Sequence, residues 1–230
     1  MKTIKQITLL VILALFFQNC ASTKVLDAWK AESSVVDLFK QKNVLVIART
    51  ENTQARLAFE IEIANALRAK GIKVTESYKK APKIHTNVEM SEERVALIKS
   101  LLESEGFNAV VITVVKDKSE TVRTSSNGVY MGASYNNYYP GHYGGFYNYY
   151  RAPYAYGSYY NSFGGYIPTS SSTYTETKYV LETVAYNLDE PEESQLVSVV
   201  TTSLDDPKEA YKTAAKYVEL MMKNLEDPKK

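Results

Sequence analysis

The stretch Asn43–Arg49 reads NVLVIAR, and its four central residues are all branched or long aliphatic residues. A continuous run of this kind is typical of a strand that is buried on both faces, as in a parallel sheet. It is followed by Thr53–Lys70, where apolar residues recur at helical spacing, and by Gly71, which is typical of a helix end. A buried strand followed directly by an amphipathic helix predicts a domain of the α/β class.

The same alternation continues along the next part of the chain. Ile72–Tyr78 alternates weakly and predicts a second strand. Ser91 is a good N-cap for a second amphipathic helix, which Gly106 is expected to end, and Ala109–Val115 (AVVITVV) then predicts a third buried strand. Strand, helix, strand, helix and strand at this spacing indicate crossover connections that build a parallel sheet.

Two further strands and a helix are predicted near the carboxyl terminus. Lys178–Leu188 and Gln195–Ser203 alternate in polarity around the turn sequence DEPEES, which predicts a hairpin. Asp205 or Asp206 with Pro207 is expected to begin the last helix. The whole pattern predicts an α/β or α+β domain in which three helices pack on a mixed sheet of about five strands.

The amino terminus has the features of an export signal. Lys2 and Lys5 precede the apolar run Ile7–Phe17, and no acidic residue accompanies them. A short positive region followed by such a run is typical of a secretory signal peptide. The run is too short to cross a bilayer, since a spanning helix needs about 20 apolar residues. We therefore expect residues 1–19 to be removed.

The only cysteine of the chain, Cys20, follows this run in the sequence FFQNC. Here the chain resembles bacterial lipoprotein precursors, although Phe17 and Asn19 stand where that family prefers leucine and a small residue. Looser motifs of this kind resemble those of the Bacteroidetes group. The resemblance implies that the Cys20 thiol receives a diacylglyceryl group, and two or three acyl chains hold a protein on a membrane almost permanently. The alternative is ordinary cleavage near Ala21 or Ser22, which would give a soluble exported protein.

The predicted location follows from that resemblance. It implies a cell-envelope protein anchored to the outer membrane, and the absence of an acidic run after Cys20 favours the periplasmic side. The predicted parts of the chain are the signal peptide 1–19, a lipidated cysteine and tether over 20–34, one α/β domain over 35–126 and 174–230, and a Tyr/Gly-rich insert over 127–173.

The order of elements supports a second resemblance. The chain looks like uncharacterised Bacteroidetes lipoproteins that have a strand such as KNVLVIA after the tether and a Tyr- and Gly-rich insert before the last hairpin and helix. More distantly, its layout is similar to the periplasmic domains of curli-secretion proteins and of TolB-like proteins. The resemblance covers Asn43–Leu225 without the insert. It implies a role in envelope assembly or partner binding and no chemistry.

The insert has an unusual composition. Most of the 19 tyrosines of the chain lie in it, among Gly, Asn, Ser and Pro, and Arg151 is its only formal charge. Branched aliphatic residues are nearly absent, so an irregular, mobile extension is expected rather than a core. Tyrosine offers a flat apolar face with a polar rim, which suits contacts with a protein or a glycan. The candidate partner-binding residues are Tyr138, Tyr139, Tyr149, Tyr150, Tyr159 and Tyr160. The alternative interpretation is a low-complexity loop that folds back over one sheet edge.

Residues that carry chemistry are sparse in the sequence. The two histidines, His85 and His142, lie far apart without a second metal ligand at a familiar spacing. No serine lies in a Gly-x-Ser-x-Gly motif, and no glycine-rich loop opens a helix after a strand. The carboxylates on the predicted helices are expected to be solvated; these are Glu60, Glu62, Glu103 and Glu105. The sequence therefore predicts no catalytic, cofactor or metal site.

Charge and composition narrow the function further. The 27 Lys and Arg residues nearly balance the 26 Asp and Glu residues, which argues against nucleic acid as a partner. The leading hypothesis is a non-enzymatic, membrane-anchored envelope lipoprotein that binds a partner or serves as an adaptor in assembly. The alternatives are a homo-oligomeric structural or secretion-pore-like subunit and an envelope glycan hydrolase.

Overall fold

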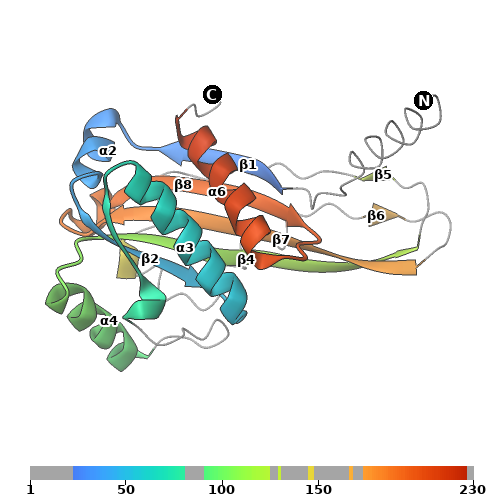
Figure 1. Cartoon of the computed structure of the whole chain (residues 1–230), viewed down its shortest axis with the longest axis horizontal. Helices are drawn as coiled ribbons and strands as arrows, with labels where there is room; N and C mark the ends of the chain where they lie inside the picture. Colours follow the sequence, from blue (N-terminus) through green and yellow to red (C-terminus); the bar gives the residue numbers. More distant parts are fainter. Residues whose placement is uncertain are drawn as a thin grey trace, which may run out of the picture.

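The computed structural model describes residues 23–80, 91–124, 129–130, 145–147, 166–167 and 173–226. Within these ranges, one mixed sheet of six strands in the order β1-β8-β7-β4-β2-β3 forms the centre of the molecule (Figure 1). Its elements are β1 (Thr23–Lys30), α2 (Ser33–Phe39), β2 (Asn43–Arg49), α3 (Thr53–Ala69), β3 (Lys73–Glu76), α4 (Glu92–Ser104), β4 (Ala109–Thr124), β7 (Thr173–Asn187), β8 (Leu196–Asp205) and α6 (Ala210–Glu226). β5 (Val129–Tyr130) and β6 (Tyr166–Ile167) pair with each other in a separate two-stranded sheet. The predicted α/β class is confirmed, with six strands in the main sheet instead of five.

The sheet combines a parallel half with an antiparallel half. β2 runs parallel to both β3 and β4, whereas β4 pairs with β7, β7 with β8 and β8 with β1 in antiparallel fashion. The predicted helices α3 and α4 connect the parallel strands. Gly71 and Gly106 follow these helices with φ angles of 80° and 67°, a left-handed conformation that glycine adopts without strain.

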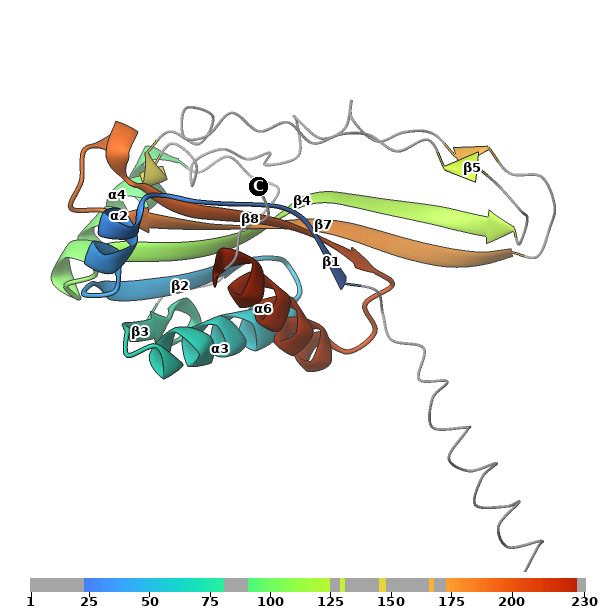
Figure 2. The same ribbon diagram turned by 90° about the horizontal axis from the view of Figure 1, so that it is seen from above.

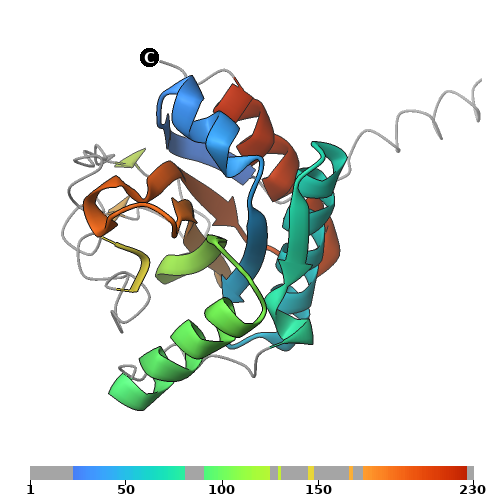
Figure 3. The ribbon, with the colours of Figure 1, turned by 90° about the vertical axis from the view of Figure 1, so that its left-hand side faces the viewer.

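The two faces of the sheet are covered by different elements (Figure 3). α3 and α6 pack on one face, where Val44 and Val46 of β2 join the first core cluster. Leu45 and Ile47 of β2 point to the other face and join a second cluster with Leu102 of α4. All four β2 residues are at most 2% exposed. Each such burial contributes roughly 1.5 to 3 kcal/mol, which is why the strand is apolar without alternation.

A row of buried, hydrogen-bonded hydroxyl groups connects α6 to the sheet. The hydroxyl oxygens of Thr113 and Thr183 lie 2.7 Å apart across β4 and β7, and the Tyr217 hydroxyl of α6 lies 2.6 Å from Thr183. The Tyr217 ring also packs edge-on against Phe59 of α3, with 5.1 Å between ring centroids. Because these buried hydroxyls bond to one another, the contact fixes the position of α6 without leaving them unsatisfied.

The predicted tether over residues 20–34 is wrong for most of its length. Thr23–Lys30 is an edge strand, β1, that pairs with β8 from Thr23↔Leu204 to Lys30↔Ser198, and α2 begins at Ser33. The register shifts between Val25 and Asp27, so the strand contains an irregularity. Such a shift breaks the two-residue period that identifies a strand in a sequence. The sheet therefore includes Thr23–Lys30, which the prediction assigned to the tether.

The strands β4 and β7 are longer than predicted. The sequence placed the end of one at Val115 and the start of the other at Lys178, but the two strands stay paired to Thr124↔Thr173. Their last five pairs, Glu120↔Thr177 to Thr124↔Thr173, extend beyond the final β7–β8 pair, Lys178↔Asp205. Figure 2 shows this two-stranded ribbon projecting past the rest of the sheet. We call residues 120–124 and 173–177 the arm.

Two further element boundaries differ from the prediction. α6 begins at Ala210 and not next to Pro207, because Asp206 has a φ angle of 48° and turns the chain before the helix starts. The second predicted strand ends at Glu76, and Ser77–Lys79 forms a 3₁₀ turn. Both differences lie at element ends, where competing local turns decide the boundary.

A charge placed on the inward side of β1 tests whether this strand belongs to the body. Val25 packs against the α6-side core, whereas its neighbour Lys24 is exposed. We expect Val25→Asp to lower the free energy of unfolding by roughly 1 to 3 kcal/mol, since a charge would be buried without a partner. Lys24→Asp should change it by less than about 0.5 kcal/mol. Urea unfolding of both variants measures this, and equal effects would mean that the segment is a tether.

Candidate functional site

The residues predicted to carry function lie outside the described part of the chain. These residues are Cys20, Tyr138, Tyr139, Tyr149, Tyr150, Tyr159 and Tyr160. Their predicted roles remain predictions. The two histidines, at which no site is predicted, also lie outside it; these are His85 and His142. The structure does describe Gly145–Tyr147, which comes from the middle of the insert, and this segment shows how the insert is attached to the body.

Phe146 is built into the second core. Its side chain is 0% exposed and packs edge-on against Tyr186 of β7, with 5.9 Å between ring centroids. The adjacent ring of Tyr147 lies 5.2 Å from it in a similar geometry, and burial, with a smaller effect of Glu103, raises the Tyr147 pKa. The expectation that the insert contributes nothing to the core is therefore wrong at Phe146. The buried aromatic ring supplies apolar surface to this core, as branched aliphatic side chains do at other core positions.

Polar contacts hold the same segment against the β7–β8 connection. The backbone N–H of Phe146 donates to Gln195 Oε1 at 2.9 Å, and Gln195 Nε2 donates to the carbonyl oxygen of Glu190 at 3.0 Å. A Cβ atom added to Gly145 would lie 2.7 Å from the Cβ of Glu192, so only glycine fits without displacement. The middle of the insert thus docks on the sheet face opposite to α3 and α6.

Four buried charged residues lie at the end of β2 and in the neighbouring parts of β4 and β7. Arg49, Lys116, Asp117 and Glu182 are each at most 5% exposed, and we call them the charged group. Lys116 Nζ lies 2.9 Å from Glu182 Oε1. Glu182 lies two residues before Val184, a member of the second core, so its side chain shares that face. The charged group therefore continues the second core toward the arm.

Lys116 lies on this face because it continues the side-chain alternation of β4. Ile112 and Val114 belong to the second core, and Lys116 follows at the same two-residue spacing. The β4–β7 register shifts between Val115 and Asp117, which makes Lys116 the extra residue of β4. Its ammonium group lies 2.9 Å from Glu182 Oε1, a carboxylate that would be costly to bury alone. The sequence prediction ended this strand at Val115 and therefore did not identify the pair.

The electrostatics of the charged group suit a structural role. Burial raises the pKa of Asp117, and burial, with a smaller effect of the nearby Glu182, raises the pKa of the Tyr186 hydroxyl. Glu182 is 0% exposed and lies 2.9 Å from Lys116 Nζ, so its negative charge is compensated inside the protein.

Glu60 on α3 is buried, and the prediction that it is solvated is wrong. Its Oε1 accepts hydrogen bonds from Ala48 N (3.1 Å), Arg56 Nε (3.0 Å) and Ser77 Oγ (2.7 Å). Its Oε2 accepts from Tyr78 N at 2.8 Å. Glu60 thereby joins α3 to β2 and to the 3₁₀ turn. Its partners are distant in sequence, and helix periodicity alone gives no sign of them.

The other acidic residues divide into paired and exposed groups. Glu76 is 3% exposed and lies 2.8 Å from both Arg68 Nη2 and Lys79 Nζ. Burial opposes ionisation of Glu76, but hydrogen bonds from Arg68 and Lys79 outweigh it and lower its pKa to about 2. Glu103 and Glu105 are exposed as predicted, whereas Glu62 is half-buried.

A cavity of about 200 Å³ lies at the end of the sheet where β2 ends and α3 and α6 begin. It is lined partly by polar residues, among them Thr50, Asn52, Thr113, Tyr179 and Lys208. Asn52 also caps α3 by accepting a hydrogen bond from Ala55 N at 3.1 Å. An apolar cavity of about 150 Å³ binds benzene, so this volume suits a ring-sized group and not a large cofactor.

Metal-binding and membrane-spanning elements were sought in the described residues. Among them, no three His, Cys, Asp or Glu side chains lie close enough together to hold a metal ion. Asp189 of the acidic turn lies 2.6 Å from Lys42 Nζ and accepts a hydrogen bond from Asn108 Nδ2 at 3.0 Å. No helix in this part of the chain has the length and apolar character needed to cross a bilayer.

Comparison with known proteins gave weak structural likenesses. No family model matches the chain, and no curated protein matches it. A PelC dodecamer from Paraburkholderia phytofirmans is 12% identical with a TM-score of 0.39, over 91% of this chain and 100% of that one. A DUF4136 family protein from Bacteroides thetaiotaomicron is 13% identical with a TM-score of 0.32, over 89% and 95%. At these values the likenesses assign neither a family nor a function.

Removal of the Phe146 ring tests the docking of the insert. Phe146→Ala should lower the free energy of unfolding by about 3 to 5 kcal/mol, because a fully enclosed aromatic side chain leaves a cavity beside Tyr186. Leu97→Ala, at a side chain that is 59% exposed, is the matched control and should cost less than about 0.5 kcal/mol. Urea unfolding measures both. A Phe146→Ala variant as stable as the control would show that the segment is not docked in solution.

Proposed function

We propose that this chain is a non-catalytic lipoprotein of the cell envelope that binds an envelope protein or glycan while a lipid on Cys20 holds it on the outer membrane. The body faces the periplasm in this proposal. The candidate contact residues are the paired tyrosines of the insert, namely Tyr138, Tyr139, Tyr149, Tyr150, Tyr159 and Tyr160.

The position of the first strand is the observation that carries the proposal. β1 begins at Thr23, three residues after the only cysteine. A lipid on Cys20 would therefore hold the body next to the membrane without a long spacer. Three residues span at most about 11 Å. An anchored Cys20 would therefore keep the start of β1 within about 11 Å of the lipid attachment point.

The interactions of the buried carboxylates support a non-catalytic role. The carboxylate of Glu60 accepts four hydrogen bonds, and those of Glu76 and Glu182 are ion-paired. A general acid or base has to reach a substrate proton. These three buried carboxylates instead bind side chains and backbone of the protein itself, so they stabilise the fold.

The arm favours a second function, that of a homo-oligomeric structural subunit. Beyond the Lys178↔Asp205 pair, the described strand pairing of the arm is that between β4 and β7, and one further backbone hydrogen bond, from Asp206 N to the Thr177 carbonyl oxygen at 2.7 Å, reaches its base. An isolated two-stranded ribbon is marginally stable in water. Packing of the arm on a neighbouring copy would stabilise it, as in a closed ring of identical subunits.

The anchor is tested on protein that its native host has processed. The intact mass of the membrane-derived protein should equal residues 20–230 plus a diacylglyceryl group, with or without a third acyl chain. Cys20→Ser should move the protein from the membrane pellet to the soluble fraction, because no acyl chains would hold it. Wild-type protein that washes free in plain buffer, with an unmodified thiol, would refute the anchor.

The binding partner is tested by crosslinking in the same membranes. Replacement of the six paired tyrosines by serine should abolish crosslinks to another envelope protein or glycan, since serine removes the aromatic contact area. The unfolding midpoint should stay unchanged because Phe146 is retained. Tyr211→Ser, at an exposed tyrosine of α6, is the matched control. Crosslinks that survive the six replacements would refute the role of the tyrosines, and a ladder of this chain alone would favour the structural subunit.

A further inference from the structure

The register of the sheet places the start of β1 beside the base of the arm. Thr23 pairs with Leu204, Leu204 with Tyr179, and Tyr179 with Lys118. These four residues therefore lie at about the same level along the strand direction. The arm begins two residues beyond Lys118, at Glu120, and points away from the body, as Figure 2 shows. The anchored end of the chain and the arm consequently lie at the same end of the molecule.

The arm is longer than the segment that joins the body to Cys20. From Lys118 to Thr124 the strand advances six residues, or about 20 Å at ~3.4 Å per residue. From Cys20 to Thr23 the chain advances three residues, or at most about 11 Å. If the strands stood perpendicular to the membrane with the arm toward it, the tip of the arm would enter the bilayer.

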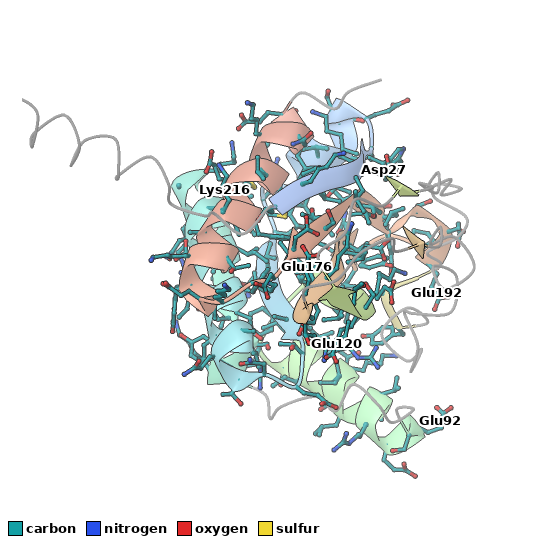
Figure 4. All side chains as sticks on the ribbon, turned by 90° about the vertical axis from the view of Figure 1, so that its right-hand side faces the viewer. Asp27, Glu92, Glu120, Glu176, Glu192 and Lys216 are labelled. Carbon is teal, nitrogen blue, oxygen red and sulfur yellow. The ribbon has the colours of Figure 1, made fainter. Side chains whose placement is uncertain are left out.

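The polar groups of the arm do not suit the hydrocarbon interior of a bilayer. Its sequence consists of ETVRT and TYTET, which include two carboxylates and a guanidinium group. Glu120 and Thr121 are exposed, and the exposed Lys118–Glu120 ion pair at the base has an N–O distance of 2.6 Å. Figure 4 views the molecule from the arm end, with Glu120 on one strand and Glu176 on the other. Backbone N–H and C=O groups at the edges of a two-stranded ribbon are also costly to place among lipid tails, where water cannot bond to them.

We propose that the arm lies along the membrane surface, in contact with lipid headgroups. This inference rests on the proposed lipid anchor. A tether of about 11 Å and an arm of about 20 Å are compatible without penetration only if the strands tilt by more than about 57° from the membrane normal. The mixed charges and hydroxyl groups of the arm suit the zwitterionic and hydrated headgroup layer. The lipid partner is thus the headgroup region of the same leaflet that receives the acyl chains.

The experiment places a fluorophore on the arm of the lipidated protein. Cys20 is blocked by its thioether, so Thr121→Cys provides one reactive thiol, and Glu193→Cys in the β7–β8 connection provides a matched site at the opposite end of the sheet. The protein is reconstituted in phosphatidylethanolamine–phosphatidylglycerol vesicles that carry a nitroxide either on the headgroup or deep in the acyl chain. The headgroup nitroxide should quench the Thr121 label several-fold more than the deep nitroxide does, and more than it quenches the Glu193 label.

Every other outcome contradicts either the placement of the arm or the lipid anchor. Stronger quenching of the Thr121 label by the deep nitroxide would mean that the arm penetrates the bilayer. A Thr121 label that no nitroxide quenches, or that is quenched less than the Glu193 label, would mean that the arm points away. The intact mass of the same preparation separates these outcomes from a failed anchor. A protein without lipid refutes the proposed function and this placement together, whereas a lipidated protein with an unquenched arm refutes only the placement.

Discussion

The antiparallel pairing of β4 with β7 is the interaction on which the rest of the structure depends. It continues from Ala109↔Asn187 to Thr124↔Thr173 with one register shift. On one side of the pair, β4 also pairs with β2, and β3 follows at the sheet edge. On the other side, β7 also pairs with β8, and β1 follows at the opposite edge. The pair thus joins two halves with different strand directions. It also closes the long connection that contains the insert, at an entropic cost that grows only slowly with loop length.

The second face of the sheet changes from apolar to charged where the register of this pair shifts. Lys116 is the extra residue, and its ammonium group lies against Glu182. Apolar residues cover this face as far as Val114, and buried charges follow toward the arm. At the other end, Phe146 of the insert packs on Tyr186 beside the β7–β8 connection. The face without α3 and α6 is therefore completed partly by the insert itself, which links the tyrosine-rich segment to the stability of the body.

The direction of β1 connects the fold to the proposed function. Because β1 enters the sheet antiparallel to β8, Thr23 lies at the end from which the arm projects. A strand of the opposite direction would have placed Cys20 at the end that carries the β7–β8 connection. The start of β1, the arm and the cavity lined by Thr50 and Tyr179 all lie at this end of the sheet. Lipid attachment would then fix which end of the molecule meets the membrane and which end faces the periplasm.

Local sequence patterns determined the elements that bury a regular apolar face. The run Asn43–Arg49, the helix that ends before Gly71, and the hairpin strands follow from side-chain periodicity, because a strand or helix with a regular face repeats its pattern over a few residues. The signal-like amino terminus and the tyrosine clustering are likewise properties of composition alone.

Only the tertiary structure decided the features that depend on partners far away in the chain. β1 is a strand because β8 pairs with it, and the arm is extended because two polar segments pair with each other. Glu60 is buried because β2 and the 3₁₀ turn donate hydrogen bonds to it. Phe146 belongs to the core because its ring packs against Tyr186 and its N–H donates to Gln195. In each case the free energy comes from contacts between distant segments, which leave no periodic trace in the local sequence.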